Sequence, residues 1–158
     1  MITWITENVA IGERADFVFP RLGDSQKRFK EAKIDCVLDL TVNNDIVEGI
    51  FCDKLGINYY HIPVGRHQGL KPIKIELRTA AYMLEQLTEK YKRILVHCTA
   101  GIDRAPFVVA YWIAGYSGYG KDINFIYSKE FNFNFWISKA YELIKEKRSQ
   151  VIEHMEWI

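Results

Sequence analysis

The chain contains 158 residues, of which 49% are hydrophobic and 26% are charged, and its formal net charge is +1. This length and composition are typical of one soluble globular domain that buries a sizeable core. A net charge near zero excludes a general electrostatic attraction to nucleic acid or to a membrane surface. The longest apolar run, at 107–114, is too short to span a bilayer. We therefore expect a single domain over residues 1–158, with no membrane span and no strong nucleic-acid signal.

The three cysteines, Cys36, Cys52 and Cys98, are odd in number and form no Cys-x-x-Cys pair. This pattern argues against a disulfide framework or a zinc site, and it favours a reducing compartment. The N-terminal residues also lack the basic region and the long apolar core of a signal peptide. We therefore expect a cytoplasmic protein that needs no metal and no other cofactor. Cys36 is expected in the core, with a redox partnership with Cys98 as the alternative.

The first sixty residues predict short strands separated by helices. Runs of β-branched and apolar residues predict the strands. Polar residues that can cap a helix, such as Asp24 and Ser25, mark the start of a helix. Strands are expected at 3–5, 9–11, 34–40 and 57–62, and helices at 26–32 and 46–54.

The rest of the chain continues this alternation. Two glycines and a proline mark 64–74 as a loop, and apolar residues at helical spacing predict an amphipathic helix at 75–91. Strands that alternate with helices predict an α/β fold, in which helices cover a central, mostly parallel sheet. A further helix is expected from Ala105, and it is apolar on every side up to Ile113. The remaining elements expected are a strand at 94–96, helices at 121–128 and 136–147, and a last turn at 151–157.

The stretch at 93–106 carries the chemistry. A strand leads into a tight loop from Cys98 to Arg104 that contains Gly101, and Pro106 stands in the first turn of the next helix. A loop between a strand end and a helix N-terminus points backbone N–H groups at one spot, where the helix dipole favours an anion. The cysteine adds a nucleophile whose thiolate this setting stabilises. The arginine adds a planar fork of donors that matches phosphate oxygens.

His97, Cys98 and Arg104 form the pattern His-Cys, five residues, Arg, which resembles the signature of the cysteine-dependent protein-tyrosine-phosphatase superfamily. The surrounding elements look like those of its small dual-specificity-like members, so the resemblance covers most of the chain and implies their α/β phosphatase architecture. It implies a phosphomonoester hydrolase in which Cys98 attacks phosphorus and forms a phosphocysteine intermediate. Arg104 would then clamp two oxygens, and His97 would orient the loop. The residues expected to bind phosphate are Thr99, Ala100, Gly101, Ile102, Asp103 and Arg104.

The chain departs from the family pattern at two points. Ala105 stands where most members carry the serine or threonine that helps the sulfur leave in the second step, although members similar to plant glucan phosphatases also carry alanine there. The general acid of the family is an aspartate in the loop after an Ile-Pro strand end. That aspartate is missing here, because the region after Pro63 reads Val64-Gly65-Arg66-His67.

Several residues are candidates for the missing acid. Asp103 precedes Arg104, which resembles the myotubularin and Sac-type phosphoinositide phosphatases, where that aspartate has been proposed as the acid. Alternatively, Asp103 caps the following helix. His67 is the second candidate, because histidine titrates near neutral pH, and Arg66 beside it is expected to support the site. Asp39 and Asp45 are further possibilities.

The sequence leaves the substrate and the oligomeric state open. A phosphorylated protein is the default, because most small members of the family act on phosphotyrosine or phosphoserine proteins. The basic loop, with Arg66, His67, Lys71 and Lys74, either suits a polyanion such as a phosphoglucan, a phosphoinositide or an RNA 5′-phosphate, or is a solvated turn. An aromatic cluster at 131–136 belongs either to the core or to a sugar-stacking surface. The non-enzymatic alternative is a pseudophosphatase, which would bind phosphate without turnover.

Overall fold

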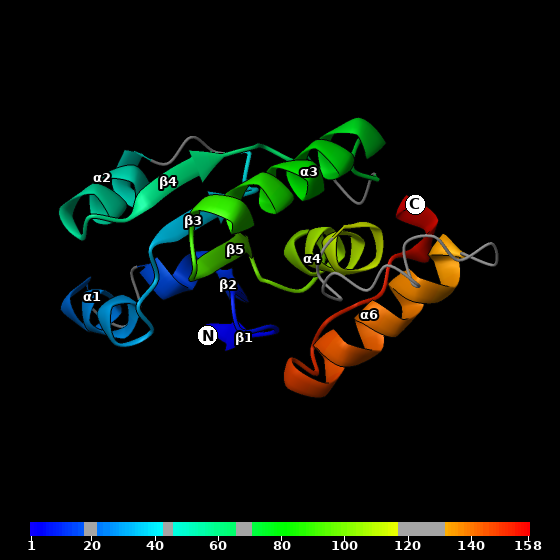
Figure 1. Ribbon diagram of the computed structural model, residues 1–158. Coiled ribbons are helices and arrows are strands. Elements are labelled where there is room, and N and C mark those ends of the chain that lie inside the picture. Colours follow the sequence, from blue (N-terminus) through cyan, green and yellow to red (C-terminus); the bar gives the residue numbers. More distant parts are fainter. Residues whose placement is uncertain (18–21, 43–45, 66–70, 117–131) are drawn as a thin grey trace.

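The computed structural model describes residues 1–17, 22–42, 46–65, 71–116 and 132–158 (Figure 1). Five strands in this part of the chain form one sheet, in the order β1-β2-β5-β3-β4. All neighbouring strands are parallel except β1 and β2, so the predicted α/β fold with a mostly parallel sheet is confirmed. The strands are β1 Thr3–Trp4, β2 Val9–Glu13, β3 Cys36–Asp39, β4 Asn58–His61 and β5 Ile94–Cys98.

Helices cover both faces of the sheet. They are α1 Leu22–Glu31, α2 Ile46–Lys54, α3 Lys74–Lys90, α4 Arg104–Gly115 and α6 Phe133–Lys147, together with the 3-10 helices η1 Arg14–Phe17 and η3 Met155–Trp157. One hydrophobic cluster joins the sheet to Phe29 of α1 and to Phe51 of α2. A larger cluster joins the other face to α3, α4 and α6. Figure 1 shows α4 and α6 side by side, on the other side of the strands from α1.

β5 is the central strand and lies between β2 and β3. Successive side chains of a strand point to opposite faces of the sheet. Ile94, Val96 and Cys98 therefore join the cluster of α3, α4 and α6, whereas Leu95 joins the cluster of α1 and α2. His97 shares the face of Leu95. The strand thus turns the histidine and the cysteine of the sequence pattern to opposite sides.

The register of β3 and β5 decides the role of Cys36. Cys36 lies opposite Ile94, four residues before Cys98 on β5. At about 3.3 Å per residue this offset is ~13 Å, whereas a disulfide needs Cα atoms within about 7 Å of each other. The alternative of a redox partnership with Cys98 is therefore wrong. Cys36 is a buried core residue with a free thiol, as expected.

Most elements begin and end within a few residues of their predicted bounds, but the start of α1 differs. The helix begins at Leu22, so Asp24 and Ser25 lie inside its first turns, and the predicted cap is wrong. Ser25 is fully buried. That burial fits a position on the packed face of the helix rather than at an exposed helix start.

α6 begins three residues before its expected start at Trp136. The Asn132 side chain caps the helix by accepting a hydrogen bond from the Phe135 N–H at 3.2 Å. Phe133 packs edge-on against Tyr111, with ring centroids 4.8 Å apart, whereas Phe135 is 50% exposed. The described part of the aromatic cluster is thus divided between the margin of the core and the surface.

The expected helix at 121–128 and the position of Phe131 lie outside the residues that the structure describes. The last turn of the chain is present as η3. Within the described ranges, every helix is too short or too polar to cross a bilayer.

Candidate active site

The loop from Cys98 to Arg104, called the signature loop below, connects the end of β5 to the start of α4. Cys98 is 2% exposed, and its Sγ accepts a hydrogen bond from the Ala105 N–H at 3.4 Å. This N–H belongs to the first turn of α4, where the helix dipole favours negative charge. The structure thus places the predicted nucleophile at the N-terminus of α4, within reach of a backbone donor.

The carbonyl groups of the signature loop are held by residues outside the loop. In a trans peptide the N–H points away from the C=O of the preceding residue. A carbonyl that is fixed on the outer side therefore turns the next N–H to the inner side, which favours a cradle of amides for an anion. The contacts are Cys98 O with His97 Nδ1 (3.3 Å), Thr99 O with Arg14 N (3.1 Å), Gly101 O with Arg148 Nε (2.9 Å) and Ile102 O with Ile152 N (3.1 Å).

Gly101 is buried and has a backbone φ of +67°. Glycine adopts this left-handed conformation at little cost, whereas a residue with a Cβ is strained in it. A Cβ at this position would also lie 2.5 Å from Arg148 Nη2 and 2.7 Å from Gly12 O. The loop therefore requires glycine here, both for its backbone shape and for the close approach of Arg148.

Two acceptors fix the guanidinium of Arg104. Nη1 donates to Val64 O at 2.9 Å, and Nη2 donates to Thr99 Oγ1 at 2.9 Å. Val64 lies in the segment after β4 that lacks the expected aspartate, so this segment contributes a backbone acceptor instead. A guanidinium has five N–H donors. The two bonds therefore set its plane and leave donors for an anion.

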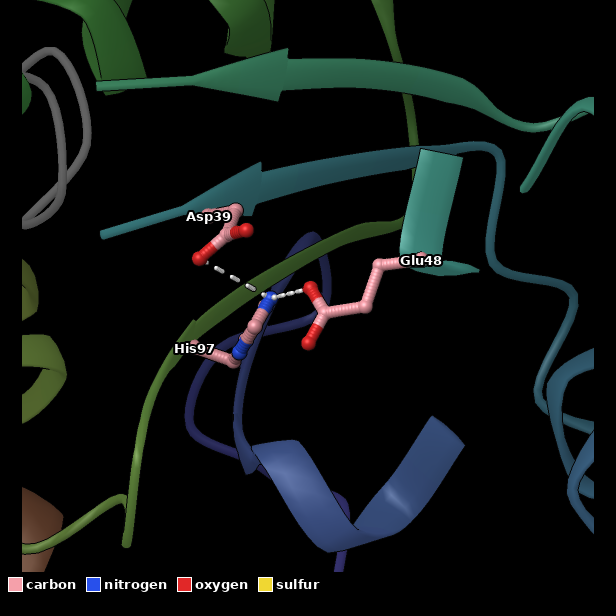
Figure 2. A group of neighbouring side chains, drawn as sticks. All are labelled: Asp39, Glu48 and His97. Atoms are coloured by element: carbon pink, nitrogen blue, oxygen red, sulfur yellow. Dashed lines mark ion pairs between the residues drawn. The ribbon is translucent and has the colours of Figure 1, made fainter. Parts of the chain in front are cut away.

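His97 lies between two buried carboxyl groups (Figure 2). Its Nε2 is 3.0 Å from Glu48 Oε2 and 3.3 Å from Asp39 Oδ1, and none of the three side chains is more than 2% exposed. Burial alone would favour the neutral ring. The hydrogen bond with Glu48 and the charge of Asp39 outweigh burial and raise the pKa of His97. The arrangement thus favours a buried imidazolium at the residue that precedes the predicted nucleophile in the chain.

The two carboxyl groups differ in their surroundings. Burial acts to raise the pKa of Asp39, but His97 and hydrogen bonds from Tyr59 and Thr41 lower it overall. For Glu48, burial is the largest influence and raises the pKa in spite of His97. Asp39 is therefore the more firmly ionised partner of the histidine, and Glu48 is the one that is more easily protonated.

The ligand atoms of Asp39, Glu48 and His97 lie within 4.8 Å of one another, a spacing that could hold a metal ion. However, Thr41 N and Oγ1 already donate to Asp39 Oδ1, at 2.8 and 2.7 Å, and the Tyr59 hydroxyl donates to Oδ2. These bonds and the contact of His97 with Glu48 favour an ion-paired histidine over a metal centre. Asp39 is also buried on the opposite face of the sheet from the cysteine, so its candidacy as the general acid is wrong.

Asp103 stands at the N-cap position of α4, but its side chain makes no capping hydrogen bond. Its Oδ1 lies 2.6 Å from Nε2 of His154 instead. The Asp103 side chain is 25% exposed. The capping interpretation is therefore wrong, and the carboxyl is both accessible and held by a titratable side chain.

Arg148 directly follows α6 and is 2% exposed. Besides Gly101 O, its guanidinium donates to Met1 O at 2.5 Å and to Thr3 Oγ1 at 2.8 Å, and Nη2 lies 3.9 Å from Glu13 Oε2. Burying a charge is costly unless it is hydrogen-bonded and paired. Nε and Nη1 are hydrogen-bonded, whereas Nη2 has the ion pair with Glu13 and no hydrogen-bond partner among the described residues. Arg148 thereby ties the signature loop to the β1–β2 edge of the sheet.

Sequence reasoning did not single out Glu48, Arg148 or His154. Each resembles an ordinary surface charge on a helix or turn. The contacts of Arg148 and His154 with the signature loop span 47 and 51 positions of the chain. Arg66, His67 and Asp45 lie outside the described residues, so their predicted roles stay predictions.

A family model and a relative of known sequence match the chain. The family model for the catalytic domain of dual-specificity phosphatases matches residues 22–158. The tyrosine-protein phosphatase vhp-1 of Caenorhabditis elegans is 30% identical over 142 residues, which cover 85% of this chain. The chain spans only 20% of the length of that relative.

Solved structures share the fold at lower identity. The Yvh1 phosphatase domain from Chaetomium thermophilum has a TM-score of 0.69 and 16% identity, and the match covers 99% of this chain and 92% of that one. Tk-PTP in its active form has a TM-score of 0.63 and 19% identity, with coverage of 99% and 90%. OH1, a tyrosine phosphatase from the Orf virus, has a TM-score of 0.66 and 19% identity, with coverage of 99% and 81%.

Proposed function

The chain belongs to the family of dual-specificity phosphatase catalytic domains, and we propose that it hydrolyses phosphomonoesters through a covalent phosphocysteine on Cys98. The family match confirms the resemblance that the sequence pattern indicated. One observation carries the proposed activity. The Cys98 thiol lies at the N-terminus of α4, in the loop that ends with an Arg104 guanidinium fixed by Val64 O and Thr99 Oγ1.

In the first step, Cys98 Sγ attacks phosphorus, the Sγ–P bond forms, and the bond from phosphorus to the leaving oxygen breaks. Negative charge is then spread over the non-bridging oxygens, where preorganised donors contribute most. The backbone amides of the signature loop and the free donors of Arg104 bind these oxygens. The proposed phosphate-binding residues are Thr99, Ala100, Gly101, Ile102, Asp103 and Arg104. Water then hydrolyses the phosphocysteine and releases inorganic phosphate and the Cys98 thiolate.

His97 acts in this proposal as a positioning residue rather than as a base. Its ring lies on the opposite face of β5 from the Cys98 side chain, and its Nδ1 lies 3.3 Å from Cys98 O. The carboxyl groups of Asp39 and Glu48 raise the pKa of the ring and hold it in place. The histidine therefore orients the start of the loop, as the family resemblance implies.

Asp103 is the proposed general acid. The segment 64–74 contains no aspartate or glutamate, and the carboxyl of Asp103 is partly exposed at the end of the signature loop. His67 stays the second candidate, with Arg66 as its supporting neighbour. An aryl phosphate with a weakly basic leaving group needs little of this proton donation, whereas an alkyl phosphate needs much more.

A phosphorylated protein is the proposed substrate. The relative from Caenorhabditis elegans is named a tyrosine-protein phosphatase, which supports this choice. Two exposed lysines, Lys71 before α3 and Lys74 at its start, leave a polyanion such as a phosphoglucan, a phosphoinositide or an RNA 5′-phosphate as the alternative. Comparing kcat/KM for a phosphotyrosine peptide and for these polyanions decides between them.

Turnover of p-nitrophenyl phosphate by the wild type and by Cys98→Ser tests the proposed activity. The weakly basic leaving group isolates the nucleophile and the arginine from the question of the acid. Cys36→Ala is the matched control, because burial raises the pKa of the Cys36 thiol to about 12 and its side chain lies far along the strand from the loop. We expect Cys98→Ser to abolish turnover and Cys36→Ala to keep it. Phosphate or vanadate binding without any turnover would instead support a pseudophosphatase.

We further propose that residues 1–158 form one phosphatase domain in a reducing compartment such as the cytoplasm. The family match begins at residue 22, but β1 and β2 precede it and belong to the same sheet as the catalytic strand. All three cysteines are free thiols, and Cys98 must be reduced to act as a nucleophile. Limited proteolysis that released residues 1–21 without loss of stability would contradict the single domain.

A further inference from the structure

The C-terminal segment, residues 148–158, holds three successive residues of the signature loop. Arg148 donates to Gly101 O at 2.9 Å, and the Ile152 N–H donates to Ile102 O at 3.1 Å. His154 Nε2 then reaches Asp103 Oδ1 at 2.6 Å. The first two contacts fix the backbone of the loop. The third differs in kind, because it joins two titratable side chains.

His154 is itself held on every side. Its Nδ1 lies 2.7 Å from Glu156 Oε1, and its ring stacks on Trp157, with centroids 3.7 Å apart and planes 2° from parallel. Its backbone N–H donates to the Tyr141 hydroxyl at 3.3 Å. Its side chain is 11% exposed, compared with 25% for Asp103 and 50% for Glu156. The imidazole is therefore a fixed, mostly buried group behind a more accessible carboxyl.

His154 has a carboxyl oxygen at each of its two ring nitrogens, so both nitrogens take part in the contacts that hold the ring. The hydrogen bond with His154 is the largest cause of the lowered pKa of Glu156, to which the charge of Lys71 also contributes. Asp103, His154 and Glu156 thus form a line of three titratable groups. In this line Glu156 orients the His154 ring, and the ring in turn contacts Asp103, the group proposed to exchange protons.

We propose that His154 is a positioning residue that fixes the Asp103 carboxyl for proton exchange at the phosphoryl site. This inference rests on the proposed phosphatase function and supplies the acid that the loop after β4 lacks. In the first step, Asp103 gives its proton to the leaving oxygen as the Sγ–P bond forms and the P–O bond breaks. In the second step, Asp103 takes a proton from the attacking water as the Sγ–P bond breaks. His154 stays in contact with Asp103 Oδ1 throughout, so the carboxyl keeps its position in both steps.

Two substrates that differ in their leaving group separate this role from a structural one. The leaving group of p-nitrophenyl phosphate is a weak base, and that of phenyl phosphate is a stronger base that needs a proton. We expect His154→Ala and Asp103→Asn to lower kcat/KM for phenyl phosphate, which reports the first step alone, tenfold or more, since general acids contribute about 10²–10⁴-fold. The loss of kcat/KM for p-nitrophenyl phosphate should stay below roughly threefold, because its departure needs little protonation. The double variant should lose no more than Asp103→Asn alone, because the histidine acts through the aspartate.

Glu153→Gln is the matched control. Glu153 lies in the same segment, but it pairs with Lys145 at 3.2 Å rather than with the loop, so both rates should stay at wild-type values. If His154→Ala does not fold, His154→Gln replaces it, because glutamine keeps a donor for Asp103 but lacks the ring that stacks on Trp157. We expect this variant to show an intermediate loss on phenyl phosphate.

Three results would overturn the inference. They are equal losses on both substrates for His154→Ala, additive losses in the double variant, and a wild type that cleaves p-nitrophenyl phosphate but not phenyl phosphate. Failure of the underlying function has a different signature, since Cys98→Ser would then match the wild type on p-nitrophenyl phosphate.

Discussion

Replacing Gly101 by alanine tests whether the signature loop depends on the close approach of Arg148. The new Cβ would lie 2.5 Å from Arg148 Nη2 and 2.7 Å from Gly12 O, at a backbone φ of +67°. Holding a residue with a Cβ in this conformation costs about 1–2 kcal/mol. Displacing Arg148 from Gly101 O costs roughly 1.5–3 kcal/mol more, the range for a hydrogen bond to a charged group. We therefore expect Gly101→Ala to lower the free energy of unfolding by about 3–5 kcal/mol.

Thermal unfolding followed by circular dichroism measures this loss. For domains of this size each kcal/mol shifts Tm by roughly 2–4 °C, so the variant should melt about 6–20 °C below the wild type. Gly49→Ala is the matched control, because Gly49 lies inside α2 and nothing lies within 4 Å of an added Cβ. Alanine there should raise the free energy of unfolding by about 0.5–1 kcal/mol.

A Gly101→Ala variant that melts within roughly 2 °C of the wild type would refute this reasoning, since that shift corresponds to less than about 1 kcal/mol. The loop would then adjust without losing its contacts with Gly12 and Arg148. A large loss in both variants would also count against it, because the effect would then follow from adding any methyl group. Turnover of p-nitrophenyl phosphate below the melting temperature gives a second readout. Gly101→Ala should lower it, since the amides that follow residue 101 would be displaced.

Two further predictions concern the buried charges around the loop. Since the pKa of His97 is raised in the folded protein, its stabilising charge is complete below about pH 6.5 and is lost as pH rises through the folded value. The free energy of unfolding of the wild type should therefore fall as pH rises. Urea denaturation from pH 5 to 9 should show a weaker dependence of this free energy on pH for Glu48→Gln. The same pH dependence in both proteins would contradict the ion pair. Arg148→Met should lower the free energy of unfolding by on the order of 3 kcal/mol, because buried acceptors lose their donor. Arg148→Lys should recover only part of this loss, because an ammonium cannot reach Gly101 O and Thr3 together as the guanidinium does. Equal stability of the wild type and both variants would argue against Arg148 as the tie between the signature loop and the β1–β2 edge.

The elements and the reactive loop could be predicted because their signals are local. Apolar periodicity fixes the helix at Lys74–Lys90 and the strands to within about two residues. Cys98, Gly101 and Arg104 lie within one short segment, and the need for a nucleophile, a tight turn and an anion-binding side chain explains their spacing. The same kind of reasoning failed at Asp103, because a polar residue before a helix usually caps it, and only the folded chain offers His154 as a competing partner.

The residues that hold the loop could not be predicted because their partners are distant in the chain. Glu48 reaches His97 only through the packing of α2 against the sheet, and nothing in a helix of nine residues indicates which side chain will face a histidine. Arg148 stands at the end of a helix with Lys145 and Lys147 in its last turn. Such a run is typical of a solvated, basic helix end, yet Arg148 is buried.

The positions of these charges follow from what the loop must do. Amides that converge on one space bring like dipoles together, so the loop is unfavourable by itself when no anion is bound. A cation at the outward-facing carbonyls offsets this cost, because it stabilises the opposite end of the same peptide dipoles. Arg148 at Gly101 O and His97, whose pKa is raised, at Cys98 O occupy such positions. In the proposed mechanism these two residues therefore hold the carbonyls of the loop between turnovers, so that the donors for the transition state are in place before substrate binds.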